Sequence, residues 1–200
     1  MLRWRLKKSV PFEADEMLIS FMRQTARDGG VDIVTGAART RVVREYESLV
    51  ESAGMSAGVV QSSTLAALPL LADTRPALLV RVAGTSLTTA IVREGELCGY
   101  RCTTLPADVS SLTPQVLLDE VYPLAAYYQD SWREGIAQVR LSGLAGRTEE
   151  FREPLARELG CAVGPLLGAG STDGRSRAGE QPLIDRGLDA LIGWAENRGA

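Results

Sequence analysis

Two glycine-containing turns hold the residues whose types best suit chemistry. The first is Gly84-Thr85-Ser86, which lies between two runs rich in Leu, Val, Ile and Thr. A turn built from glycine and hydroxyl residues exposes backbone N–H groups, and such a turn can hold a phosphate. The same three residues also make an ordinary hairpin turn. From the residues of this turn alone, both interpretations stay open.

The second turn is Ser142-Gly143-Leu144-Ala145-Gly146, which follows an apolar run and precedes Thr148-Glu149-Glu150. A strand, a glycine turn and a helix capped by Thr148 would let a nucleotide approach the backbone closely. However, the six-residue spacing of a Walker loop is absent, and no lysine follows Gly146. The alternative is that Gly143 and Gly146 only turn a strand into a helix.

The composition excludes several kinds of site. The chain has 200 residues, a net charge of −3 and no histidine. It therefore has no general attraction to nucleic acid, and Ser/His or Cys/His catalysis is excluded. Three cysteines without CxxC spacing argue against a zinc site and favour a reducing compartment, and the roles of Cys98 and Cys102 stay open. We expect no signal peptide and no membrane-spanning segment.

The elements around the two turns are predicted from periodicity and turn residues. The three strands predicted around the first turn are rich in β-branched residues. Thr113-Pro114 marks a helix start, and Gly160 marks a helix end. We predict strands at Leu78–Ala83, Leu87–Val92, Leu97–Thr103, Ile136–Leu141 and Cys161–Val163, helices from Thr113, from Thr148 to Leu159 and at Leu183–Trp194, and a loop at Gly168–Gly179.

The first part of the chain is predicted to be a small α/β lobe. A helix over Arg39–Ala53 would bury one apolar face and end at Gly54. The opening Leu2–Lys8 fits a strand or the end of an amphipathic helix. Further strands are predicted at Met17–Met22, Val31–Ala38 and Met55–Val60, and a helix at Leu65–Leu71 behind the cap Ser62-Ser63-Thr64. We place the first lobe at residues 1–71, a boundary at 72–76 and the second lobe at 77–200.

Taken together, these segments resemble the PilM family of type IV pilus assembly proteins, actin-like relatives of the cell-division protein FtsA. The resemblance covers nearly the whole chain and depends on the order and spacing of five passages. These are Leu6–Phe12 with Ala14-Asp15-Glu16, Ile33–Gly54 with Val59, the hairpin Leu79–Thr89, the loop Leu141–Gly146, and the closing Asp189–Gly193. The resemblance implies an α/β fold with an actin-like, RNase H-like second lobe, and it suggests that an N-terminal part is missing.

The same resemblance implies a function. It implies a cytoplasmic scaffold, peripheral at the inner membrane, that binds the cytoplasmic tail of a PilN-like membrane protein and other pilus platform proteins. It also implies a cleft for ATP and Mg²⁺ between the lobes. The residues that would contact nucleotide are Gly84, Thr85, Ser86, Ser142, Gly143 and Gly146.

The chain departs from the family in that cleft. Where the family's hairpin begins with a metal-holding Asp, this sequence has Arg81 or Val82. Arginine has no acceptor and cannot hold Mg²⁺, although it can pair with phosphate. Leu144-Ala145 replaces a more glycine-rich run, and the family's first phosphate loop is absent. We therefore expect weak or no ATP binding, no hydrolysis and no metal site.

Two alternatives remain. The chain could be a working ATPase of the same fold, which needs an acidic residue near the γ-phosphate, and the candidates are Asp73, Asp108 and Asp119. It could also be an unrelated α/β binding module. For a partner peptide, strand addition beside Met17–Met22 is the predicted mode.

Overall fold

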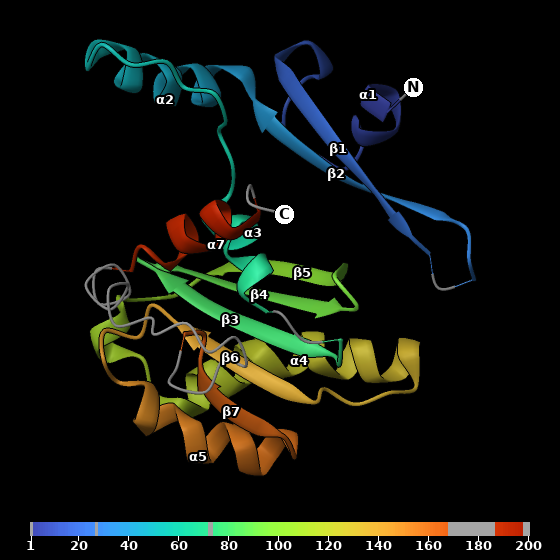
Figure 1. Ribbon diagram of the computed structural model, residues 1–200, viewed down its shortest axis with the longest axis vertical. Helices are drawn as coiled ribbons and strands as arrows, with labels where there is room; N and C mark the ends of the chain where they lie inside the picture. Colours follow the sequence, from blue (N-terminus) through green and yellow to red (C-terminus); the bar gives the residue numbers. More distant parts are fainter. Residues whose placement is uncertain (1, 27, 72–73, 168–186, 198–200) are drawn as a thin grey trace. The chain divides into compact units, whose positions relative to one another are not determined.

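The computed structural model describes residues 2–26, 28–71, 74–167 and 187–197. By its contacts the chain forms two compact units, Met1–Gln61 and Ser62–Ala200 (Figure 1). The sequence placed this boundary later, at 72–76. The difference arises because helix α3 (Ser63–Ala67) packs against helix α7 (Asp189–Asn197) of the second unit.

The second unit is built on a five-stranded mixed sheet of order β5-β4-β3-β6-β7. Strands β5, β4 and β3 are antiparallel neighbours, whereas β3, β6 and β7 run parallel. The mixed sheet predicted for this part of the chain is confirmed. The strands are β3 (Ala77–Ala83), β4 (Ser86–Arg93), β5 (Glu96–Thr104), β6 (Gln138–Ser142) and β7 (Ala162–Pro165), close to the predicted ranges.

Helices cover both faces of this sheet (Figure 1). On one face, alternate residues of β3 such as Leu78 and Val80 pack with Leu117 of α4 (Pro114–Trp132) and Phe151 of α5 (Thr148–Leu159). On the other face, Leu79 packs with residues of α3, of η2 (Leu68–Leu70) and of α7. Because side chains alternate along a strand, this second face also receives Arg81.

The contact between α3 and α7 depends on a glycine. A Cβ at Gly193 of α7 would lie 2.3 Å from the carbonyl oxygen of Ala66 and 3.0 Å from the Cα of Ala67. The two helices therefore approach backbone to backbone at this position. This close packing attaches the start of the second unit to its end.

The first unit is a two-stranded antiparallel ribbon with helices. Strand β1 (Met17–Thr25) pairs with β2 (Val31–Arg39), and the helices are α1 (Leu2–Leu6) and α2 (Thr40–Ser52), with one 3₁₀ turn, η1 (Ala14–Glu16). Helix α2 ends before Gly54, whose φ of +76° suits a helix stop. The strands predicted at Met17–Met22 and Val31–Ala38 and the long helix of this unit are confirmed.

Four predictions about local structure were wrong. Met55–Val60 is not a strand and pairs with no described strand. The predicted apolar face of α2 is mostly exposed, since only Val43 is buried. Thr148 is the first residue of α5 rather than its cap, which is Arg147. The helix predicted at Leu65–Leu71 starts earlier, at Ser63, and changes to a 3₁₀ turn at Leu68.

The last segments are described only in part. The predicted loop Gly168–Gly179 lies outside the described residues. Of the helix predicted at Leu183–Trp194, residues 183–186 also lie outside them, and α7 begins at Asp189.

Candidate functional site

A cleft of about 600 Å³ lies in the second unit at the carboxyl ends of the parallel strands β3 and β6. In mixed α/β sheets, the carboxyl ends of neighbouring parallel strands are where ligands usually bind. Among the described residues, the cleft is lined mainly by glycine and apolar residues, with one arginine and one aspartate. Its lining includes Arg81, Gly84, Ser142, Gly143, Gly146 and Asp189.

Gly143 lies where the loop after β6 crosses closely over β3 in the cleft. Its φ is +77°, and a Cβ there would lie 1.8 Å from the carbonyl oxygen of Val82. The loop after β6 can therefore pass over β3 only with glycine at this position. Gly146 also has a positive φ, +82°, but a Cβ there would meet nothing within 4 Å.

The two charged residues in the described lining of the cleft form a buried pair. Arg81 is 5% exposed and Asp189 is 2% exposed. The Nε and Nη2 atoms of Arg81 donate to the two carboxylate oxygens of Asp189 at 3.3 Å and 3.1 Å. Both oxygens of the carboxylate are thus engaged by one guanidinium, in the two-pronged geometry that strengthens such pairs.

Three further groups complete this network. Ser142 Oγ donates to Asp189 Oδ2 at 2.6 Å. Arg81 Nη1 donates to Ser63 Oγ at 2.9 Å, and its Nη2 donates to the carbonyl oxygen of Gly187 at 3.4 Å. Arg81 thereby connects the sheet to the first residue of α3 and to the segment that enters α7.

The structure brings together four of the six predicted site residues. Gly84, Ser142, Gly143 and Gly146 line the cleft, while Thr85 and Ser86 are not among its lining residues. The carbonyl oxygen of Thr85 accepts from the N–H of Leu105 at 2.7 Å, and Ser86 begins β4, paired with Ala83.

Asp189 was missed as a site residue, although the closing helix that contains it was noticed. Its partner Arg81 was noticed as a departure from the family but was considered only as a counter-charge for phosphate. The alternation Leu79-Val80-Arg81 was a usable signal, because it places Arg81 on a buried face that needs an acidic partner.

The acidic candidates for a catalytic role have structural contacts. Asp108 caps a 3₁₀ turn, η3 (Val109–Ser111), and accepts from the backbone N–H and the hydroxyl of Ser110, which lowers its pKa. Asp119 accepts from the side-chain amide of Gln115 at 2.8 Å. Neither is among the residues that line the cleft. Asp73 lies outside the described residues.

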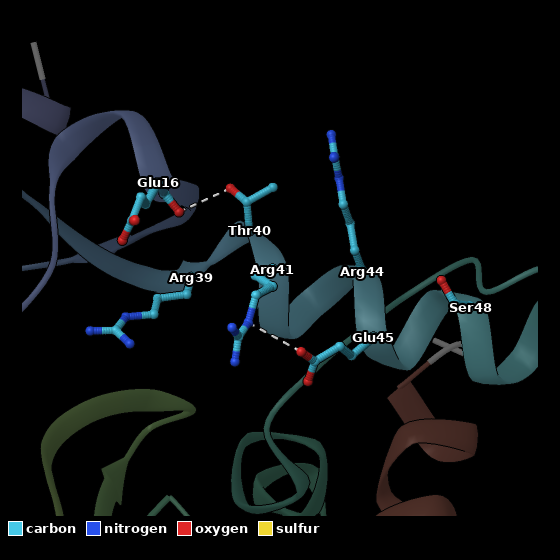
Figure 2. A pocket seen from close by; sticks show the side chains of 7 residues that line it. All are labelled: Glu16, Arg39, Thr40, Arg41, Arg44, Glu45 and Ser48. Carbon is cyan, nitrogen blue, oxygen red and sulfur yellow. Dashed lines mark hydrogen bonds and ion pairs between the residues drawn. The ribbon is translucent and has the colours of Figure 1, made fainter.

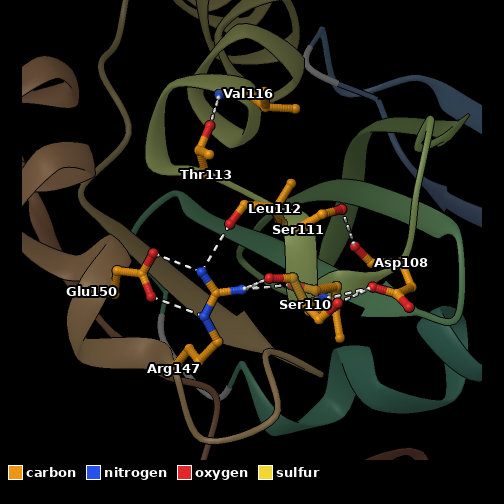
Figure 3. Close-up of polar contacts among 9 residues, drawn as sticks. Asp108, Ser110, Ser111, Leu112, Thr113, Val116, Arg147 and Glu150 are labelled. Carbon is orange, nitrogen blue, oxygen red and sulfur yellow. Dashed lines mark hydrogen bonds and ion pairs between the residues drawn. The ribbon is translucent and has the colours of Figure 1, made fainter.

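An arginine holds the Asp108 loop in place (Figure 3). Arg147 donates to the carbonyl oxygens of Val109 and Leu112 at 2.6 Å and 2.9 Å. It also donates to both carboxylate oxygens of Glu150, at 2.6 Å and 2.8 Å, and this lowers the pKa of Glu150. These contacts are those of a structural clamp between the loop and α5.

Within the described residues, neither the cysteines nor a group of metal-binding side chains adds to the candidate site. Burial raises the pKa of the Cys98 and Cys161 thiols, so both stay protonated near neutral pH. All three cysteines are free. Within the described ranges, no three His, Cys, Asp or Glu side chains gather as metal ligands would.

The first unit has a second, more open pocket of about 660 Å³ beside the start of α2 (Figure 2). Arg41 pairs with Glu45 at 3.2 Å, and Thr40 Oγ donates to the carbonyl oxygen of Glu16 at 3.0 Å. The Arg39 guanidinium lies over the Phe12 ring, whereas Arg44 points away from these pairs. The pocket is polar and carries both signs of charge.

The ribbon of the first unit exposes apolar side chains. On one face, Phe21 is 61% exposed, Val31 57% and Ile33 50%. The pairing of Arg23 with Ile33 and of Phe21 with Thr35 makes Phe21 and Ile33 diagonal neighbours on that face. We call Phe21, Val31 and Ile33 the ribbon patch. Met22 is 55% exposed and points to the opposite face.

Known proteins were compared with the chain by sequence and by structure. No family model and no curated protein sequence matches it. Among solved structures, a chain of a "PilM-PilN type IV pilus biogenesis complex" matches 96% of this chain and 71% of its own length, with a TM-score of 0.65 and 17% identity. The chain has a PilM-like fold.

This match confirms the fold predicted from the sequence. Because the sequence identity is only 17%, the match shows the fold and nothing further. A Bacteroides thetaiotaomicron protein with an actin-like ATPase fold and unknown function also matches 80% of the chain and 58% of its own length. Its TM-score is 0.47 at 8% identity. In the part of the chain that the structure describes, no helix is both long and apolar enough to span a bilayer.

Proposed function

We propose that this protein is a scaffold of a type IV pilus or related secretion assembly platform, and that it acts by binding partner proteins. The observation that carries the proposal is the PilM-like fold, which extends over 96% of the chain. The matched structure is a complex of PilM with PilN. We propose that the corresponding partner here is the cytoplasmic tail of a PilN-like membrane protein, with other platform proteins around it.

The proposed location follows from that partner. A protein that binds the cytoplasmic tail of an inner-membrane protein lies in the cytoplasm, peripheral to that membrane. The net charge of −3 gives no electrostatic attraction to an anionic bilayer. Recruitment would therefore depend on the protein partner rather than on lipid.

The ribbon of the first unit is the proposed docking surface. A two-stranded ribbon is marginally stable alone, and its apolar side chains favour a covering partner. Strand β1 pairs with β2 and with no other described strand, so its second edge can accept an extended peptide. The ribbon patch would then contact alternate side chains of that peptide.

The contacts in the cleft support a scaffold without ATP hydrolysis. Arg81 brings no oxygen ligand for Mg²⁺, and its guanidinium is already engaged by Asp189. Because the Asp189 carboxylate is held by Arg81 and Ser142, we propose that the cleft does not hold a metal-bound triphosphate. The alternative, a nucleotide-binding member of the same fold, is favoured by the four glycines among the described residues that line the cleft.

A binding experiment on the ribbon patch tests the proposal. Detergent-solubilised PilN-like protein from the same organism is captured by the wild-type chain, by Phe21→Ser and by Met22→Ser. We expect Phe21→Ser to lose most of the capture and Met22→Ser, on the opposite face, to keep more of it. Failure of the wild-type chain to capture the partner would overturn the proposed function.

A further inference from the structure

The pair of Arg81 and Asp189 is unusual because both charges are withdrawn from water. Burying two charges is costly unless geometry and further hydrogen bonds offset the lost hydration. Here the donors of Arg81 reach Asp189, Ser63 and the carbonyl oxygen of Gly187. The Asp189 carboxylate receives the Arg81 fork and the Ser142 hydroxyl. These hydrogen bonds indicate an organised polar site rather than a chance contact between two charges.

The donors of this network are those of an oxyanion site. A guanidinium fork binds carboxylate and phosphate in the same two-pronged way, and a hydroxyl adds a third donor. They lie near the carboxyl ends of β3 and β6, where ligands of such sheets bind. The glycines 84, 143 and 146 line the cleft around them.

The occupant of these donors comes from the chain itself. Asp189 is the first residue of α7, the helix that packs on α3 through Gly193. We infer that the cleft contains an oxyanion-binding site whose resident ligand is the Asp189 carboxylate. The start of α7 takes the place that a free phosphate-type or carboxylate anion would occupy, and the internal ligand anchors α7 to the sheet.

This inference is independent of the proposed pilus function, because it uses only contacts within the second unit. It makes a distinct prediction. If Asp189 is an internal ligand, removing its carboxylate leaves Arg81 and Ser142 as an open site that an added anion can fill. If the pair is only a structural ion pair, added anions will not restore what the substitution removes.

The test is rescue of Asp189→Ala by inorganic phosphate. We expect Asp189→Ala to melt below the wild-type chain, and phosphate to raise its melting temperature by about 3 °C or more with saturation. The wild-type chain serves as one control. The double variant Arg81→Met/Asp189→Ala is the other, because it lacks the fork. Sodium chloride at matched ionic strength removes general salt effects.

The outcomes separate the interpretations. Saturable stabilisation of Asp189→Ala, with none in the double variant, supports the site. Equal shifts in all three proteins would overturn it. Sodium acetate in place of phosphate distinguishes the sources: rescue by acetate alone indicates a site for carboxylates, and rescue by phosphate alone indicates a site for phosphate groups.

A second variant covers the case in which Asp189→Ala does not fold. Asp189→Asn keeps the shape of the side chain and removes its charge, and phosphate binding is then followed by ³¹P line broadening. Broadening in Asp189→Asn that is absent in Arg81→Met/Asp189→Asn supports the inference. No difference between these two proteins contradicts it.

Discussion

At the scale of single residues, the cleft depends on Gly143 more than on its other glycines. Both Gly143 and Gly146 have positive φ, but only at Gly143 would a Cβ meet a backbone oxygen, that of Val82, at 1.8 Å. We predict that Gly143→Ala lowers the free energy of unfolding by about 2–4 kcal/mol, because strain and overlap add.

Gly146→Ala is the matched control for this prediction. It carries the left-handed strain without the overlap, so we expect a loss of about 1–2 kcal/mol. Urea denaturation followed by circular dichroism measures both. Equal losses in the two variants would show that the loop does not pass over β3 as closely as the structure has it.

The Asp108 and Glu150 carboxylates predict a pH dependence. Hydrogen bonds from Ser110 lower the pKa of Asp108, and hydrogen bonds from Arg147 lower the pKa of Glu150. A carboxyl group with a lower pKa in the folded state stabilises the fold above its unfolded pKa, which is about 4 for Asp and Glu. This contribution is lost as the pH falls through the folded pKa.

We therefore expect the urea midpoint to fall as the pH is lowered from about 5 towards 3. Asp108→Asn should show a shallower fall, since one of the two groups no longer titrates. Parallel pH profiles for the wild-type chain and Asp108→Asn would mean that Asp108 contributes nothing to this dependence.

At the scale of elements, the contact between α3 and α7 is expected to reverse the usual effect of a glycine-to-alanine substitution on stability. Replacing glycine by alanine inside a helix normally adds about 1 kcal/mol of stability. At Gly193 the new methyl group would lie 2.3 Å from the Ala66 carbonyl oxygen. We predict that Gly193→Ala destabilises the second unit instead, by about 1–3 kcal/mol.

Differential scanning calorimetry of Gly193→Ala measures this change. Ala195→Gly, at an exposed position of the same helix, reports the propensity effect alone and should cost about 1 kcal/mol. A stabilised Gly193→Ala would contradict the backbone-to-backbone packing of the two helices.

Elements were predictable where periodicity and turn residues agreed. The hairpin strands of the second unit and the end of α5 at Gly160 follow from β-branched runs and a left-handed glycine. The strand predicted at Met55–Val60 failed because an apolar run without a pairing partner has no sheet to join. The prediction that one face of α2 is buried was wrong, because an amphipathic pattern does not show whether another element covers that face.

At the scale of the whole molecule, the mixed sheet and its helices were predicted, and the pairing across the cleft was not. Arg81 and Asp189 are 108 positions apart. No local pattern connects residues so distant, so their contact appears only in the fold. The cleft residues Gly84, Ser142, Gly143 and Gly146 were predicted because turn geometry is encoded locally.

The central claim is a scaffold that binds its PilN-like partner without nucleotide. Calorimetric titration of the chain with the cytoplasmic tail of that partner, with and without ATP and Mg²⁺, tests it most directly. We predict binding with the same dissociation constant in both titrations, and no heat from ATP alone. Binding that requires ATP, or that changes tenfold on its addition (about 1.4 kcal/mol), would contradict the account.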